Sequence, residues 1–253
     1  MKNSLILLFA VLVLAACSKH KTAQNTPLDP AMDMSGFTVL TDVVPDAILE
    51  IRYHSTYNFV GARIDGYEQP VALLTHRAAD SLRAVSDELK ARGYRLKIWD
   101  AYRPQRAVNH FIRWAENVQD TAMKRIFYPM VDKSLLFEQG YIYARSSHSR
   151  GSTVDLTLVE EATGREVDMG SPFDWFGDES HPSYRRLTYM QCTCRLILRN
   201  AMLKHGFEPI DSEWWHFTLA DEPYPDTYFN FPVSTFDSSV STFNSSISAV
   251  ALQ

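Results

Sequence analysis

Cysteine is scarce in this sequence of 253 residues, which has three, at positions 17, 192 and 194. A bridge between Cys192 and Cys194 would be strained, and positions two apart on a helix point in different directions, so we expect both to pack inside a helix. The sequence has no basic run, and its formal net charge is −5. Nucleic acid as a partner therefore has no support. A dinucleotide-binding glycine fingerprint and a phosphate-binding loop are also absent from the sequence.

Long hydrophobic runs are absent too, since the longest, at 4–14, is too short to span a bilayer comfortably. It follows Lys2 and precedes Ala15-Ala16-Cys17, which is typical of a lipoprotein signal peptide with small residues before the cleavage site. We predict that residues 1–16 are that signal and that Cys17 is lipidated. A plain signal peptide or a membrane anchor is the alternative. Residues 17–35, polar and without apolar periodicity, would be a tether that holds a periplasm-facing lipoprotein to the bacterial cell envelope by its lipid alone.

The C-terminal segment is rich in serine and contains a near-repeat, STFDSSV at 234–240 followed by STFNSSI at 241–247. Its apolar content is too low to build a core, so we predict that residues 233–253 are disordered. An edge strand or a partner-binding tail is the alternative. The folded domain is then expected at 36–232.

Apolar residues make up 45% of the chain, enough for a buried core. Helical spacing predicts a helix between a Thr75 cap and Gly93, one that begins with Pro104 and buries Val118 at its end, and one at 183–205. Alternation predicts strands at 95–99, 152–159, 207–210 and 214–219. These elements indicate an α+β fold, with helices packed on a small, mainly antiparallel sheet.

Two short segments carry the chemistry, SSHSRGSTVD at 146–155 and EWWH at 213–216. Zinc in hydrolases usually keeps three protein ligands and leaves a fourth position for water, and His148, Asp155 and His216 supply a suitable donor set. Each of them alone is more often an ordinary polar residue. Glu213, three residues before His216, could take a proton from the metal-bound water, although a surface glutamate is the alternative. Co²⁺ or Mn²⁺ could also occupy this set of ligands.

Arg103 stands between a predicted strand and a predicted helix. From that turn its guanidinium could reach a cleft and stabilise the oxyanion of a tetrahedral intermediate. It could equally pair with a nearby carboxylate such as Asp100.

Five motifs, SSHSRGS..DLTL, EWWHF, WD.YRP, DGYE and DEPYP, closely resemble those of the VanX-like D-alanyl-D-alanine dipeptidases, over about residues 39–232. The resemblance implies the fold of the hedgehog, lysostaphin-type and D,D-carboxypeptidase proteins. It implies one zinc ion per chain on His148, Asp155 and His216, with Glu213 as base and Arg103 as transition-state arginine.

The same resemblance implies how a substrate is held. Tyr53 and Asp174 would hold the substrate's ammonium and Ser146 would lie near its carboxylate. The alternatives are a core tyrosine, a loop carboxylate and a turn serine.

The activity implied by the resemblance is zinc-dependent hydrolysis of the D-alanyl-D-alanine dipeptide to two D-alanines. A role in cell-wall peptide turnover is expected, with glycopeptide resistance as the second possibility. A D,D-carboxypeptidase on peptidoglycan stems is the first alternative activity. A non-catalytic, zinc-containing wall-binding lipoprotein is the other, although a structural metal needs neither Glu213 nor Arg103. The sequence leaves the oligomeric state open.

Overall fold

The computed structural model describes residues 32–235. The predicted signal peptide, Cys17, most of the predicted tether and nearly all of the serine-rich repeat lie outside the described residues. Among residues 32–235, no helix has the length and hydropathy needed to cross a membrane.

A five-stranded sheet forms the centre of the molecule, with strand order β2-β4-β5-β7-β6. Its strands are β2 (Ile48–Leu49), β4 (Tyr94–Asp100), β5 (Thr153–Glu160), β7 (His216–Leu219) and β6 (Phe207–Pro209). All neighbours pair antiparallel except β2 and β4. A second, two-stranded sheet joins β1 (Phe37–Val39) to β3 (Leu73–Thr75). The predicted α+β fold with a small, mainly antiparallel sheet is confirmed.

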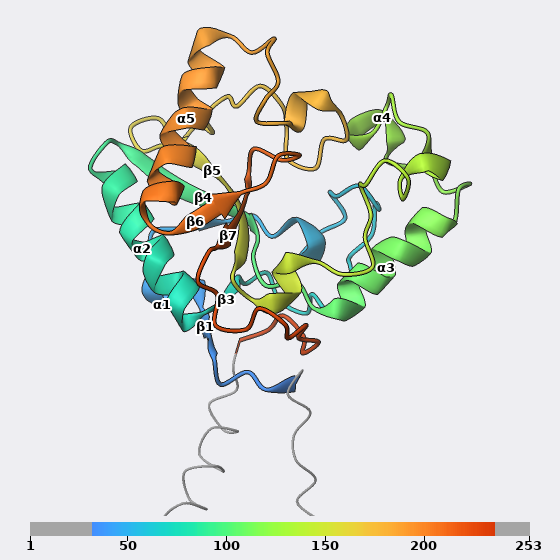
Figure 1. Cartoon of the computed structure of the whole chain (residues 1–253), viewed down its shortest axis with the longest axis horizontal. Helices are drawn as coiled ribbons and strands as arrows, with labels where there is room; N and C mark the ends of the chain where they lie inside the picture. Colours follow the sequence, from blue (N-terminus) through green and yellow to red (C-terminus); the bar gives the residue numbers. More distant parts are fainter. Residues whose placement is uncertain (1–31, 236–253) are drawn as a thin grey trace, which may run out of the picture.

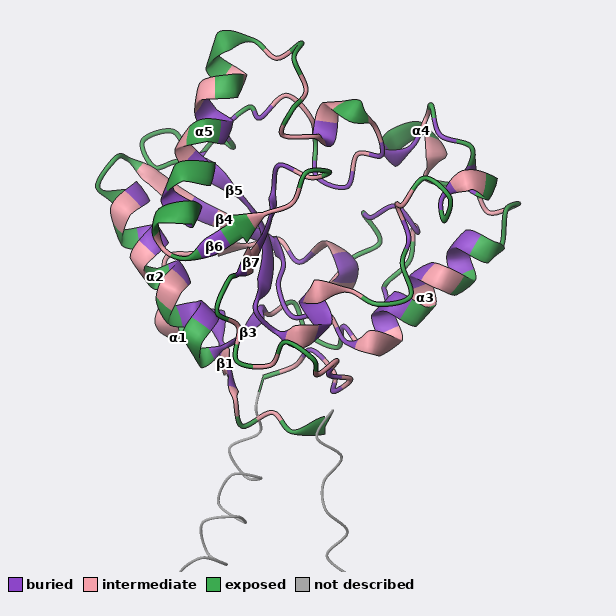
Figure 2. Cartoon of the chain, in the orientation of Figure 1, coloured by how far each residue is buried: buried purple, intermediate pink, exposed green. Residues whose placement is uncertain are grey.

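Helices flank the five-stranded sheet. In Figure 1, α2 (His76–Lys90) and α5 (Tyr189–Lys204) lie on one side of it, and α3 (Gln105–Glu116) and α4 (Lys124–Phe127) lie on the other. α1 (Leu40–Val43) follows β1. Short 3₁₀ helices occur at η2 (Arg52–His54), η3 (Lys133–Leu135), η4 (Ser147–Arg150) and η5 (Asp178–Ser180). Buried residues concentrate on the central strands and on the helix faces that cover them (Figure 2).

The predicted helix boundaries are right for α2 and partly wrong for α3 and α5. Thr75 caps α2, since its hydroxyl accepts from the Ala78 amide. Pro104 is the N-cap of α3 rather than its first residue, because its extended ψ of 150° lies outside the helical region. α3 ends at Glu116, so Val118 falls beyond it and is 44% exposed, not buried as predicted.

α5 begins at Tyr189, six residues later than predicted, because Thr188 and Gln191 form a capping box there. Met190, in the first turn of this helix, is 64% exposed. Of the two cysteines predicted to pack inside this helix, Cys194 is buried and Cys192 is exposed.

The folded unit is slightly longer than predicted at both ends. Val233, assigned to the disordered tail, is buried and pairs with Tyr67, because its amide donates to the Gly66 carbonyl. The Thr235 amide donates to the Gln69 side chain. Met34, assigned to the tether, packs against the core. The two ends of the described part lie at the same edge of the molecule (Figure 1).

Candidate active site

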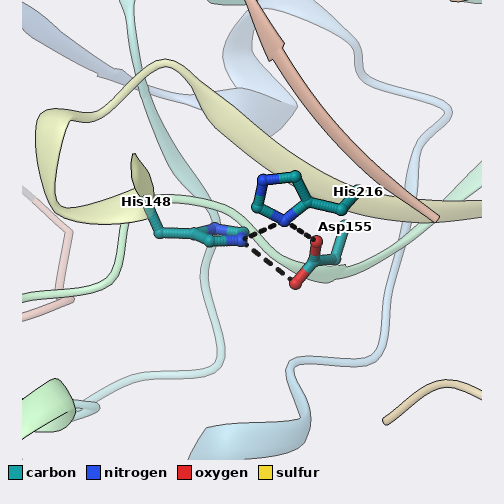
Figure 3. A group of neighbouring side chains, drawn as sticks. All are labelled: His148, Asp155 and His216. Carbon is teal, nitrogen blue, oxygen red and sulfur yellow. Dashed lines mark hydrogen bonds and ion pairs between the residues drawn. The ribbon is translucent and has the colours of Figure 1, made fainter. Parts of the chain in front are cut away.

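The register of the sheet brings two of the predicted ligands face to face. Asp155 on β5 pairs directly with His216, the first residue of β7. His148 lies on η4, just before β5, where the Ser146 hydroxyl caps the turn by accepting from the His148 amide. Three segments thus converge, and Figure 3 shows the three side chains pointing toward one another.

The donor atoms of these side chains are close together. His148 Nε2 lies 3.2 Å from His216 Nδ1 and 3.2 Å from Asp155 Oδ2, and His216 Nδ1 lies 3.1 Å from Asp155 Oδ1. A tetrahedral site with bonds of about 2.0–2.2 Å spaces its ligand atoms by about 3.3 Å or slightly more. Two imidazoles and a carboxylate at this spacing could hold a divalent metal ion.

Neighbouring polar groups fix the orientation of both imidazoles. His148 Nδ1 donates to the Ala101 carbonyl over 2.7 Å, which leaves Nε2 free to coordinate. His216 Nε2 lies 3.2 Å from the Ser147 hydroxyl, which leaves Nδ1 for the metal. Such outer contacts orient metal ligands. The role of Ser147 was not predicted, although it precedes His148 directly in the sequence.

Burial and charge in the cluster also favour a metal. Burial lowers the pKa of His148, so its ring is neutral near pH 7. Burial alone would raise the pKa of Asp155, but His148 and His216 outweigh it and hold that pKa below its usual range. Asp155 Oδ1 is nevertheless buried without a hydrogen bond of good geometry. A buried carboxylate oxygen without a donor fits a coordinated cation.

Glu213 lies beside the cluster, with its Oε2 3.6 Å from His216 Nδ1. Its side chain is 39% exposed, yet the surrounding protein desolvates the carboxyl and raises its pKa. The carboxylate can therefore face both the cluster and a substrate.

Arg103 pairs with Asp100, as its alternative role predicted, and its guanidinium also reaches the metal-ligand cluster. Its Nε donates to Asp100 Oδ2 over 2.9 Å, and its Nη2 lies 3.6 Å from Asp155 Oδ2. The Tyr67 hydroxyl donates to the other oxygen of Asp100 over 2.6 Å. Asp100 and Tyr67 thereby hold the guanidinium in place.

Tyr53 and Asp174 come from distant segments and meet in the same region. The Tyr53 hydroxyl donates to Asp174 Oδ2 over 3.0 Å. Asp174 has a φ of 58°, the one positive value at a non-glycine residue within 32–235. Burial, and then the charge of Asp155, raise the pKa of Asp174 well above its ordinary value.

All eight predicted site residues within 32–235 line one cleft of about 250 Å³: Tyr53, Arg103, Ser146, His148, Asp155, Asp174, Glu213 and His216. The structure thus brings together every one of them. Sequence reasoning missed the other walls, which include Tyr141, Arg145 and Phe176. A second cavity of about 440 Å³ adjoins the cleft and shares Asp174 and Glu213 with it.

Comparisons with known proteins identify the family of the chain. Residues 33–234 match the family model described as D-ala-D-ala dipeptidase (Peptidase_M15). A D-alanyl-D-alanine dipeptidase of Enterococcus faecium is 41% identical, over 78% of this chain and 98% of that protein. A D-alanyl-D-alanine dipeptidase of Streptomyces coelicolor is 37% identical, also over 78% of this chain and 98% of that protein. A solved structure of the vancomycin-resistance D,D-pentapeptidase VanY, in complex with Zn(II), aligns with a TM-score of 0.37 and 14% identity, covering 62% of this chain and 78% of that one.

Proposed function

Because the chain belongs to the D-Ala-D-Ala dipeptidase family, we propose that it hydrolyses the D-alanyl-D-alanine dipeptide to two D-alanines with one zinc ion per chain. One observation carries the proposal. The donor atoms of His148, Asp155 and His216 converge within 4.8 Å, in a cleft that also presents Glu213 and Arg103.

His148 Nε2, His216 Nδ1 and an Asp155 oxygen would hold the metal. When bound, the metal supplies Lewis acidity, which acidifies a water molecule and polarises the scissile carbonyl. Zinc is favoured by the two imidazoles and one carboxylate. Asp155 Oδ1, which is buried and makes no hydrogen bond of good geometry, supports a cation at this position.

Glu213 is the proposed general base and acid. It takes a proton from the attacking water and returns it to the leaving amine, so that one peptide bond breaks and a free carboxylate and a free amine form. Its raised pKa, caused by desolvation, suits a group that must both accept and release a proton. Arg103, held by Asp100, presents its remaining N–H groups to the negative charge that develops on the carbonyl oxygen.

The ends of the substrate have separate partners. The Asp174 carboxylate and the Tyr53 hydroxyl would bind the free ammonium. Asp174 is buried and has no cationic partner within residues 32–235, so the positive charge of the ammonium would offset the free-energy cost of burying its carboxylate. The Ser146 hydroxyl would lie near the free carboxylate. Its oxygen accepts from the His148 amide, and its own hydrogen remains available to donate.

A D,D-carboxypeptidase acting on peptidoglycan stems is the second candidate, and one feature favours it. The second cavity lies beyond Asp174 and Glu213, at the proposed ammonium end, where a longer peptide would extend. We rank it second because the Tyr53–Asp174 pair occupies that end of the cleft. A non-catalytic, zinc-containing wall-binding protein ranks third, since family membership and the presence of Glu213 and Arg103 argue against it.

The proposed location is the bacterial cell envelope, with the domain facing the periplasm and lipid on Cys17. It rests on the sequence of residues 1–17 alone. There the enzyme would meet D-Ala-D-Ala released during cell-wall peptide turnover. Periplasmic pools of the dipeptide that stay unchanged after gene deletion would rule this role out.

The first experiment compares hydrolysis of D-Ala-D-Ala, L-Ala-L-Ala and a stem pentapeptide by protein that starts after Cys17, with ninhydrin detection of released amines. It includes a chelator arm and the Glu213→Ala variant. Chelator-sensitive cleavage of the D,D-dipeptide alone, lost in the variant, is the expected result. Cleavage of the pentapeptide would favour the carboxypeptidase, and no turnover by zinc-loaded protein would favour the non-catalytic alternative.

A further inference from the structure

The cleft contains a second cationic side chain that the roles above leave unused. Arg145 lines the cleft together with Arg103. Arg103 is paired with Asp100, and Arg150, nearby, is paired with Glu222. Arg145, in contrast, has no carboxylate partner anywhere in the described part of the chain. A solvent-facing cation beside a reaction cleft is available to an anionic group of a ligand.

The guanidinium of Arg145 lies over the ring of Tyr228. Arg145 Cζ lies 4.7 Å from the centre of the Tyr228 ring, and Arg150 contacts the same ring at 5.9 Å. The backbone just before Arg145 is fixed as well, because the Ala144 carbonyl accepts from Gln105 Nε2 over 2.9 Å. A cation–π contact does not pair the guanidinium with a carboxylate, so the N–H groups of Arg145 remain available to bind one.

Arg145 lines the cleft but not the second cavity. The second cavity borders Asp174 and Glu213 but includes neither Arg145 nor Ser146. The cleft therefore presents a carboxylate, Asp174, where it borders the second cavity, and a guanidinium and a hydroxyl, Arg145 and Ser146, on lining that the second cavity does not share. A dipeptide with both ends free is a zwitterion, and this distribution of charge complements it.

We propose that Arg145, held over the ring of Tyr228, binds the free carboxylate of the substrate and makes the enzyme select peptides with an unblocked C-terminus. The inference rests on the proposed dipeptidase function and adds a specificity residue to it. Arg145 does not act on the scissile bond, so its loss weakens substrate binding and leaves the chemical step largely intact.

The test compares D-Ala-D-Ala with D-alanyl-D-alaninamide, in which the carboxylate is replaced by a neutral amide. Arg145→Gln is expected to raise KM for the acid by about ten- to hundredfold, the range of one hydrogen bond between charged groups, with kcat within about twofold. KM for the amide is expected to stay at the wild-type value. Arg145→Lys should restore part of the preference, because it keeps the charge and loses the planar fork.

Arg92→Gln is the matched control, since Arg92 is exposed at the end of α2 and lines none of the cavities around the cleft. Tyr228→Leu should reproduce part of the Arg145→Gln effect, because it removes the stacking surface. An unchanged KM for the acid in Arg145→Gln, or an equal loss with acid and amide, would overturn the proposal.

A binding experiment separates this inference from the proposed function. Calorimetric titration of acid and amide into zinc-loaded Glu213→Ala protein, with and without Arg145→Gln, needs no turnover. A preference for the acid that disappears with Arg145→Gln supports the inference even if wild-type protein fails to hydrolyse the dipeptide, in which case the proposed function fails alone. Binding of neither compound overturns both.

Discussion

The Tyr53 hydroxyl and the Asp174 carboxylate, 121 positions apart in the sequence, are joined by a hydrogen bond of 3.0 Å at one end of the cleft. Both residues are buried, and the pKa of Asp174 is raised well above its ordinary value by burial and by Asp155. The carboxyl has no cationic partner within residues 32–235. An ammonium bound there would supply the missing charge, so this pair is suited to recognising a free amino terminus.

We predict that Asp174→Asn raises KM for D-Ala-D-Ala at least tenfold, because an amide loses the charge-assisted bond to the ammonium. Asparagine tolerates the left-handed backbone that Asp174 adopts, so the loop should keep its shape. Steady-state kinetics with the free dipeptide and with its N-acetyl form checks this. Tyr53→Phe, which keeps the carboxylate, should have the smaller effect. A KM that rises equally for the acetylated peptide would contradict ammonium recognition.

Zinc should stabilise the folded protein through the three clustered ligands. At a free metal concentration about one hundred times Kd, binding contributes about 2.7 kcal/mol, which corresponds to an increase in Tm of about 5–10 °C for a domain of this size. Thermal unfolding with and without a chelator measures the shift. It should vanish in His148→Ala and persist in His76→Ala, since His76 is exposed and distant from the cluster in sequence. An equal zinc-dependent increase in Tm in His148→Ala and His76→Ala would mean that the metal binds at another site.

Arg195 on α5 is a positioning residue for the loop that carries Asp174. Its guanidinium donates to the carbonyls of Met169, Glu179 and His181 at 2.6, 2.6 and 3.0 Å. These bonds fix both ends of the segment that contains Asp174.

Arg195→Met should therefore lower the free energy of unfolding by at least about 2 kcal/mol, because it leaves carbonyls unpaired. It should also raise KM for the free dipeptide more than for its N-acetyl form. Urea denaturation and the same kinetics measure both effects. Arg199→Met, at an exposed position on the same helix, is the control and should be near neutral. Destabilisation without a change in KM would mean that Asp174 keeps its place without Arg195.

Local patterns predicted the elements with strong periodicity and caps. The helix predicted between Thr75 and Gly93 matches the structure closely, because the N-cap, the spacing of the apolar residues and the terminating glycine all indicate the same boundaries. The strand predicted at 152–159 also matches closely. The predicted start of α5 was wrong. The apolar residues of 183–188 are spaced as in a helix, but the Thr188–Gln191 capping box makes the helix begin later, at Tyr189. Val233 was misassigned because its pairing with Tyr67 depends on a contact across most of the chain.

The residues of the site were predicted, whereas its geometry depends on contacts between distant segments. Sheet register pairs Asp155 with His216, and no periodicity in the sequence specifies it. Tyr53 and Asp174 came from the family resemblance alone. Arg145 belongs to none of the sequence motifs. Its position in the cleft depends on the turn before His148 and on the contact with the Tyr228 ring.

Gly151 should be the glycine near the site that least tolerates a side chain. It ends η4 with a φ of 83°, and its amide donates to the His148 carbonyl. A Cβ there would overlap the ring of Phe37, which packs at 4.9 Å from both Phe229 and Phe231. The aromatic ring therefore has little room to move away.

An alanine at Gly164 measures the cost of backbone strain without a steric clash. Gly164 has a φ of 67°, and no heavy atom lies within 4 Å of the position that a Cβ would take. Gly164→Ala should cost about 1–2 kcal/mol, the penalty of the left-handed backbone alone. Gly151→Ala should cost at least about 2 kcal/mol more, because it adds overpacking, and should reduce the zinc-dependent increase in Tm by shifting His148. Urea denaturation and chelator melts measure both. Equal costs for the two variants would mean that Phe37 moves aside, and that the packing beneath η4 does not hold the His148 side chain in place.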